Sequence, residues 1–84
     1  MSKELILYTA KGCQLCEEIK KQLELPLARN NVVCHIIDID GDLELQHRYA
    51  ARIPVLVSGN QEICEGVLDV LALESFLLDD ERQI

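Results

Sequence analysis

Two short apolar runs flank one amphipathic segment in the first half of the chain, and this order restricts the fold more than any other feature. Residues 4–10, ELILYTA, form a nearly continuous apolar run that is typical of a buried strand. Residues 32–40, VVCHIIDID, are rich in β-branched residues and predict a second buried strand. Two strands joined by a helix predict a right-handed crossover that makes the strands parallel.

The segment between these runs has the spacing of an amphipathic helix. From Gln14 onward, Leu15, Ile19 and Leu23 recur at every fourth position, and charged residues fill the other faces. Pro26 has no N–H to donate and restricts the residue before it. We therefore expect the regular helix to end near residue 24, or one turn later at residue 29.

The second half of the chain predicts three more elements. A turn at Asp40–Gly41 precedes a short helix over residues 43–49. Two runs, 55–58 and 62–64, are joined by Gly59 and Asn60 and predict a hairpin. A last helix is expected over residues 68–78. Its predicted inward-facing residues are Leu68, Leu71, Ala72, Ser75 and Phe76 or Leu78, and residues 79–84 are expected to form a frayed tail.

The element order is therefore β-α-β-α-β-β-α, which places the chain in the α/β class. The closing hairpin adds an antiparallel pair to the parallel one, so we expect a mixed sheet flanked by helices. The chain has 84 residues, of which 49% are hydrophobic, enough to form one small core. A single domain over residues 1–84 follows.

Charge and hydropathy exclude two classes of partner. The net charge is −7 and the basic residues form no stripe, so nucleic acid is not an expected partner. The N-terminal apolar run of about six residues is too short for a signal peptide or a membrane span. We expect a soluble, cytoplasmic protein without membrane contact.

Cys13 and Cys16 form a CxxC pair at the junction of the first strand and the first helix. A disulfide framework built from all four cysteines would need a secreted context, for which there is no sign. In a reducing compartment a CxxC pair is more often redox-active or metal-binding. Its position in a β-α-β pattern is typical of thioredoxin-like redox motifs.

The predicted helix start gives the two thiols different roles. Cys13 would occupy the N-cap, where free N–H groups and the helix dipole stabilise a thiolate, so it is the candidate nucleophile. Cys16 lies one turn into the helix, within disulfide reach, and is the candidate resolving thiol. Lys11 should favour the thiolate by its charge, and Glu17 should oppose it.

Two structural or metal interpretations remain open for the cysteine pair. Small buried cysteines are common in cores, and a lone CxxC can be half of a zinc site. A zinc site needs a second pair of ligands, and the spacing of Cys34, His35, His47 and Cys64 does not supply one. We expect Cys34 and Cys64 to be core residues, and no resident metal.

The acidic run DIDGDLELQ resembles a calcium loop only in composition. It has acids at Asp38, Asp40, Asp42 and Glu44. It lacks the closing glutamate at the twelfth position and a preceding helix. A strand-to-helix turn with a charged cap is therefore the better interpretation.

Three features together resemble a known family. They are the CxxC pair after the first strand, the pair Ile53–Pro54 that opens the third strand, and Gly66 before the last helix. In these three features, residues 4–78 resemble the glutaredoxin-like branch of the thioredoxin-fold superfamily, and most closely its small bacterial members. The resemblance implies a central four-stranded mixed sheet.

The resemblance also implies roles for single residues. Pro54 would be cis and face the cysteines, and the backbone of Ile53 would pair with the substrate like an added strand. Leu7 stands where thioredoxins commonly place a buried acid. The chain departs from the glutaredoxin pattern, because Gln14–Leu15 replaces the Pro-Tyr of CPYC and Val67 replaces a second glycine after Gly66.

Three charged residues could correspond to glutathione contacts of that family. Lys11 lies near a lysine that meets a glutathione carboxylate, Asp69 could match an acid that meets its amine, and Arg52 replaces a usual threonine. Each also has a structural interpretation: a solvated loop charge for Lys11, a helix first-turn acid for Asp69, and an ordinary surface residue for Arg52.

The expected function is exchange of a Cys13–Cys16 dithiol with a protein or glutathione-type disulfide, as part of cell redox homeostasis. A reductase or glutathione would donate the electrons, no other cofactor is expected, and the protein would be a monomer. Two alternatives stay open. One is a non-catalytic adaptor with a peptide groove beside Pro54, and the other is an iron–sulfur or zinc carrier that uses the CxxC in a dimer.

Overall fold

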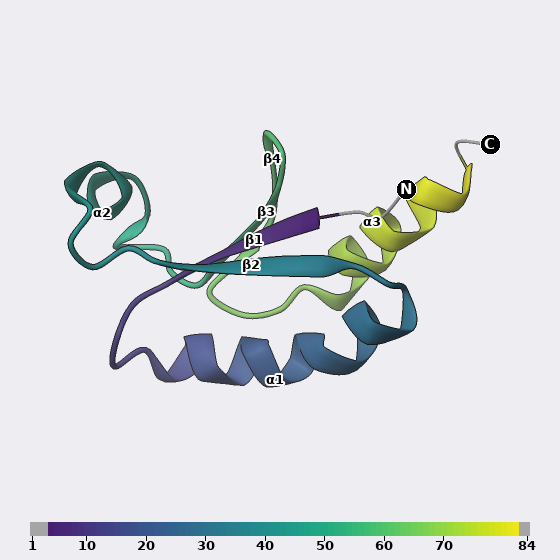
Figure 1. The fold of residues 1–84 in the computed structure, drawn as a ribbon, viewed down its shortest axis with the longest axis horizontal. Coiled ribbons are helices and arrows are strands. Elements are labelled where there is room, and N and C mark those ends of the chain that lie inside the picture. The colour runs from purple at the N-terminus through teal and green to yellow at the C-terminus, as the bar shows by residue number, and fades with distance from the viewer. Residues whose placement is uncertain (1–3, 83–84) are drawn as a thin grey trace.

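The computed structural model describes residues 4–82 and has the predicted order of elements (Figure 1). They are β1 (Glu4–Thr9), α1 (Gln14–Arg29), β2 (Val33–Asp38), α2 (Leu43–Tyr49), β3 (Val55–Ser58), β4 (Gln61–Glu65) and α3 (Val70–Arg82). Each strand begins and ends within about two residues of its predicted limits, because the turn residues that bound it act locally.

The four strands form one mixed sheet in the order β2-β1-β3-β4. β1 and β2 are parallel, with Glu4 opposite Val33 and Thr9 opposite Asp38. β3 is antiparallel to both β1 and β4, and its pairing with β4 is irregular between Leu56 and Val57. The predicted mixed four-stranded sheet is confirmed.

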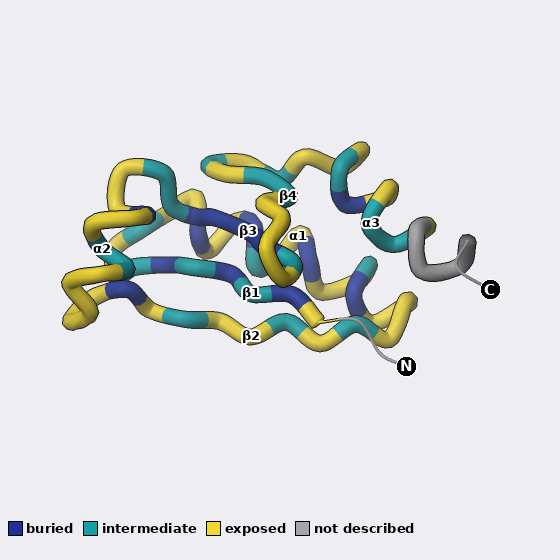
Figure 2. Tube along the Cα trace, turned by 90° about the horizontal axis from the view of Figure 1, so that it is seen from above, coloured by how far each residue is buried: buried dark blue, intermediate teal, exposed yellow. Residues whose placement is uncertain are grey.

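The sheet separates two clusters of buried side chains. α1 and α3 cover one face, and the shorter α2 covers part of the other near one end of the sheet (Figure 1). The first cluster comprises Leu5, Leu7, Ile19, Leu23, Leu27, Leu56 and Leu73, and the second Ile39, Tyr49, Val55 and Val57. Figure 2 shows that burial is concentrated in the central strands β1 and β3. The division into two clusters follows from the two-residue period of strands, which places successive side chains on opposite faces of the sheet.

Helix α1 continues to Arg29, through Pro26, so its end is the later of the two predicted positions. Pro26 lies in the last turns, where it removes one hydrogen bond without breaking the helix. Its own carbonyl accepts from the backbone and side-chain nitrogens of Asn30. Leu27, the next residue, is buried in the first cluster, and this contact holds the last turn against the sheet.

Helix α3 differs from its prediction in both ends and in orientation. It begins at Val70 and ends at Arg82, past the expected end at Leu78, and residues 83–84 of the expected tail lie outside the described residues. Leu73, Phe76 and Leu77 face the core. The inward assignment of Leu71 and Ser75 is wrong, because both are exposed, Leu71 by 77%. Of the alternatives Phe76 and Leu78, it is Phe76 that faces the core, and Leu78 is exposed.

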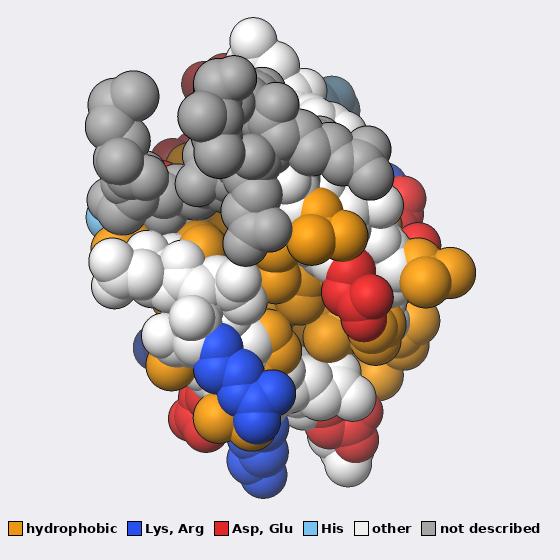
Figure 3. Space-filling view, turned by 90° about the vertical axis from the view of Figure 1, so that its right-hand side faces the viewer, with side chains coloured by type: hydrophobic (Ala, Val, Ile, Leu, Met, Phe, Trp, Pro, Cys, Tyr) orange, Lys and Arg blue, Asp and Glu red, His pale blue; other side chains and the backbone are white. Residues whose placement is uncertain are grey.

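The cause is that Leu73 sets the buried stripe of α3, and positions three and four residues beyond it share that stripe. Apolar side chains are consequently visible beside acidic and basic ones at the end of the molecule that carries α3 (Figure 3). Within residues 4–82, none of the helices combines the length and the apolar character that crossing a membrane requires.

Candidate active site

Cys13 and Cys16 lie where β1 passes into α1. Cys13 is the N-cap of α1, in extended conformation (φ −92°, ψ 103°), and its sulfur accepts a hydrogen bond of 3.1 Å from the backbone N–H of Cys16. The two residues are joined by a disulfide, with their Cα atoms 5.2 Å apart. Cys16 is fully buried, and Cys13 is half-buried. Only the sulfur of Cys13 is therefore placed for attack from outside.

The charges around Cys13 are partly balanced. The backbone N–H of Cys16, in the first turn of α1, donates to the Cys13 sulfur, and together with the positive end of the helix it favours the thiolate form. Glu17, the acid in the first turn of α1, forms an ion pair of 2.9 Å with Lys20, which reduces its opposition to a negative sulfur. Lys11 lies on the loop just before Cys13 and adds a positive charge.

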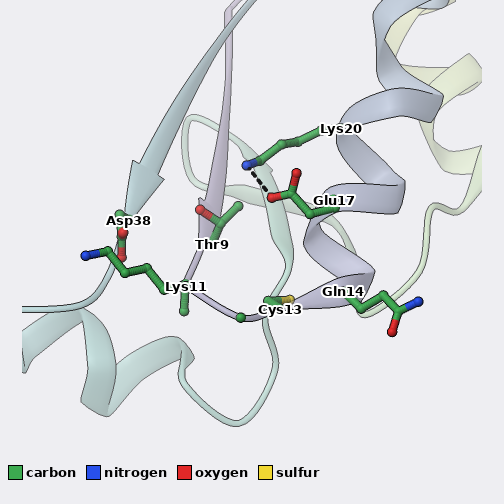
Figure 4. A pocket seen from close by; sticks show the side chains of 9 residues that line it. Thr9, Lys11, Cys13, Gln14, Glu17, Lys20 and Asp38 are labelled. Atoms are coloured by element: carbon green, nitrogen blue, oxygen red, sulfur yellow. Dashed lines mark hydrogen bonds and ion pairs between the residues drawn. The ribbon is translucent and has the colours of Figure 1, made fainter.

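A polar cleft of about 500 Å³ opens beside Cys13. Its walls come from the end of β1, the loop that follows, the first turns of α1, and the end of β2 (Figure 4). Its lining residues with polar side chains are Thr9, Lys11, Cys13, Gln14, Glu17, Lys20 and Asp38. The sequence indicated Lys11 and Glu17 as neighbours of the thiol, but it gave no sign that Thr9, Lys20 and Asp38 belong to the same site.

Pro54 and Gly66 lie close together on the side of β1 that faces β3. The Ile53–Pro54 peptide bond is cis, and the backbone N–H of Gly66 donates to the carbonyl oxygen of Pro54 over 2.8 Å. The pairing of Val55 with Tyr8 places Pro54 beside the end of β1 that leads to Cys13. These contacts link the predicted substrate residues Ile53, Pro54 and Gly66 to the cysteine loop through the sheet.

Position 66 requires glycine because of its backbone conformation and not because a side chain would lack space. Its φ of +77° lies in the left-handed region, whereas a Cβ built on it would meet nothing within 4 Å. Gly66 and Val67 line a small hollow of about 90 Å³ together with Leu15, the exposed leucine between the two cysteines. The surface over Gly66 is thus open beside the CxxC motif.

Arg52 is bound to β4. Its guanidinium donates to both carboxylate oxygens of Glu62 at 2.9 Å and lies 3.7 Å from Glu65. It also lies 5.4 Å from the ring centre of Tyr49, which stacks on Tyr8 with the centres 4.2 Å apart. The hydrogen bond with Glu62 is the main cause that raises the pKa of Arg52. A role of Arg52 in substrate binding stays a prediction, and its side chain already has partners.

Asp69 caps α3. Its carboxylate accepts a hydrogen bond of 3.0 Å from the backbone N–H of Ala72, which is the N-cap arrangement. Lys11 donates its backbone N–H to the carboxylate of Asp40 over 3.1 Å, and its ammonium group extends from the exposed loop. The glutathione contacts predicted for Lys11 and Asp69 stay predictions.

The other cysteines and histidines lie apart from the CxxC pair. Cys34 and Cys64 are half-buried free thiols, and burial is the main cause that raises the pKa of each. His35 pairs with Glu4 at 2.6 Å across β1 and β2. Among the residues that the structure describes, no three His, Cys, Asp or Glu side chains are grouped to hold a metal ion.

The sheet order, the cis-proline at the start of β3 and the CxxC disulfide at the start of α1 define a thioredoxin-fold domain. Residues 4–78 match the model of one family, the Glutaredoxin-like domain (DUF836). The chain therefore belongs to this glutaredoxin-like family, as its resemblance predicted.

Several solved structures are similar to this chain. The solution NMR structure of a Nitrosomonas europaea protein has 31% sequence identity and a TM-score of 0.81, over 90% of this chain and 92% of that one. The X-ray structure of an X. campestris protein has 26% identity and a TM-score of 0.63, over 89% and 96%. Oxidized thioredoxin O1 from Arabidopsis thaliana has 20% identity and a TM-score of 0.64, over 93% and 77%, and indicates the shared fold alone. No curated protein matches the sequence.

Proposed function

We propose that this protein is a thiol–disulfide oxidoreductase that exchanges its Cys13–Cys16 dithiol with a disulfide substrate. The observation that carries the proposal is the placement of the two sulfurs. One is half-exposed at a helix N-cap and the other is buried within disulfide reach of it. This asymmetry separates the thiol that meets the substrate from the thiol that completes the reaction.

The reaction has two exchange steps. The Cys13 thiolate attacks one sulfur of the substrate disulfide, which forms a mixed disulfide and releases the other half of the substrate as a thiolate. Cys16 then loses its proton to solvent and attacks the sulfur of Cys13. This step releases the second half of the substrate and leaves the Cys13–Cys16 disulfide. Two electrons pass from the protein to the substrate.

The surface beside Cys13 favours a substrate that lies along Ile53, Pro54 and Gly66. An extended peptide that carries a disulfide would fit this surface. It could pair with the backbone at Ile53, cross the open surface over Gly66, and contact the exposed side chains of Leu15 and Val67. We propose a protein or glutathione-type disulfide as substrate and glutathione or a reductase as electron donor. The protein would act as a monomer in the reducing cytoplasm.

A redox titration tests the proposal. The full chain is equilibrated in glutathione buffers of graded potential, its thiols are alkylated, and the state of Cys13 and Cys16 is read by mass spectrometry. We expect a two-electron transition of this pair between about −180 and −270 mV, the range of catalytic dithiol proteins. A pair that stays reduced across this range would contradict the proposal. A glutathione adduct on Cys13 would identify glutathione as a direct reaction partner.

A further inference from the structure

The polar cleft beside Cys13 lies on the side of β1 opposite to Pro54. β2 and β3 flank β1, so Asp38 at the end of β2 and Pro54 at the start of β3 are on opposite sides of the strand that leads to Cys13. The lining residues of the cleft include Asp38 and Cys13 but neither Pro54 nor Gly66. Cys13 can therefore meet a ligand from this second side.

The cleft presents one unpaired positive charge and one unpaired negative charge. Lys20 and Glu17 neutralise each other at 2.9 Å on one wall. Lys11 and Asp38 are on the other side of the cleft, with Thr9 between the two groups (Figure 4). In the described part of the chain neither the Lys11 ammonium nor the Asp38 carboxylate has an ion-pair partner, although one Asp38 oxygen accepts from the backbone N–H of Asp40 at 2.8 Å.

Thr9 adds a polar group that lacks a partner. This residue is only 5% exposed, and its side chain lines the cleft. Within residues 4–78 its hydroxyl group takes part in no hydrogen bond. No buried side-chain oxygen or nitrogen of the described residues lacks a hydrogen-bond partner, so this hydroxyl is open to the cleft, where it can donate to or accept from a polar ligand. The cleft volume of about 500 Å³ falls in the range of small-molecule sites.

We propose that this cleft binds the amino-acid zwitterion of a low-molecular-weight disulfide of the cystine type. The Lys11 ammonium would pair with the substrate carboxylate, the Asp38 carboxylate with the substrate ammonium, and the Thr9 hydroxyl with either group. A half-cystine carries both charges two bonds from the carbon that bears its sulfur, which suits a site whose wall includes the Cys13 sulfur. This inference rests on the proposed oxidoreductase function and specifies one substrate class for it.

The reaction balances without a further reagent. The Cys13 thiolate attacks one sulfur of cystine, the cystine S–S bond breaks, and one cysteine leaves as a thiolate that takes a proton from water. Cys16 gives its proton to solvent and attacks the Cys13 sulfur, which releases the second cysteine. The protein is oxidised by two electrons and cystine is reduced to two molecules of cysteine. Reduction of the protein by a dithiol, such as dithiothreitol, prepares the next cycle.

Four disulfides that differ in charge test the proposal. The reduced, full-length protein is mixed anaerobically with excess cystine (zwitterionic), cystamine (cationic), 3,3′-dithiodipropionate (anionic) or bis(2-hydroxyethyl) disulfide (neutral). The rate of Cys13–Cys16 oxidation is read by alkylation and mass spectrometry. The same rates with free dithiothreitol correct for the intrinsic reactivity of each compound. After correction we expect cystine to react about two- to fivefold faster than the neutral disulfide for each ion pair formed.

Charge variants assign the two ends of the substrate. Asp38→Asn should slow cystine and cystamine about two- to fivefold relative to the neutral disulfide. Lys11→Gln should slow cystine and dithiodipropionate by a similar factor, and Thr9→Val should slow the charged disulfides relative to the neutral one. Lys21→Gln is the matched control, because this exposed lysine of α1 lies outside the cleft. Circular dichroism of each variant checks that the fold is kept.

The outcomes separate the two proposals. If the neutral disulfide oxidises the protein but the four corrected rates agree within twofold, the zwitterion site is overturned and the oxidoreductase function stands. If Asp38→Asn or Lys11→Gln changes all four rates equally, these residues act on Cys13 and not on substrate charge, which also overturns the site. If no disulfide oxidises the Cys13–Cys16 pair, both proposals fail.

Discussion

The backbone N–H of Cys16 donates a 3.1 Å hydrogen bond to the sulfur of Cys13, so the predicted nucleophile is also the N-cap of α1. A negative sulfur accepts such a bond better than a neutral one, which favours the thiolate. Serine is a strong N-cap residue in its own right. Replacement of Cys13 by serine can therefore remove the chemistry and keep the helix start.

The first prediction concerns the two cysteine variants. Cys13→Ser should lose all disulfide reduction, because the other thiol at the start of α1, Cys16, is fully buried. Cys16→Ser should accumulate a mixed disulfide on Cys13, because the resolving attack is lost. Mass spectrometry of each variant after incubation with a disulfide peptide measures both effects. Undiminished turnover by a well-folded Cys13→Ser protein would remove Cys13 from the reaction.

Two variants of Asp69 distinguish a structural role of this residue from a role in substrate binding. Asp69→Ala should lower the free energy of unfolding by about 1 kcal/mol, because it removes the side-chain cap of α3. Asp69→Asn should retain the stability, because asparagine caps equally well. Urea unfolding measures both. If Asp69 also binds the amine of glutathione, the asparagine variant should be stable yet react more slowly with glutathione disulfide, whereas equal rates would restrict Asp69 to the cap.

Helix α1 offers a matched pair of leucines. Leu23 is 3% exposed in the first core cluster, and Leu25 on the same helix is 58% exposed. Leu23→Ala should destabilise the protein by about 2–5 kcal/mol through lost burial and a cavity. Leu25→Ala should change the stability by less than about 0.5 kcal/mol. Similar denaturation midpoints for the two variants would contradict the packing of α1 against the sheet.

The thiols of Cys34 and Cys64 should react slowly in the folded protein. Burial raises the pKa of both thiols, and a higher pKa leaves a smaller fraction of the reactive thiolate at neutral pH. Alkylation by iodoacetamide should therefore accelerate as the pH rises through a midpoint above that of free cysteine. Peptide mass spectrometry over a pH series measures this, with the urea-unfolded protein as control. Rapid labelling of folded Cys34 or Cys64 at neutral pH would contradict the prediction.

Local sequence signals predicted most of the fold. The apolar run of β1, the helical spacing of Leu15, Ile19 and Leu23, and the turn at Gly59 each act over a few residues, and the structure has the expected element at each place. The orientation of α3 could not be predicted this way. Leu71 and Leu78 are as apolar as Leu73, and only the position of α3 against the sheet decides which of them is buried.

The sequence by itself determined the order of the elements and the place of Cys13 at the start of α1, because hydrophobic period and helix capping depend on neighbours in the chain. The tertiary structure alone decided which distant residues share a site. It brought Asp38 beside Thr9 through the parallel register of β1 and β2, and it bound Arg52 to Glu62 across the hairpin. Such contacts depend on how strands align and helices dock, and these long-range packing energies leave no periodic signal in the sequence.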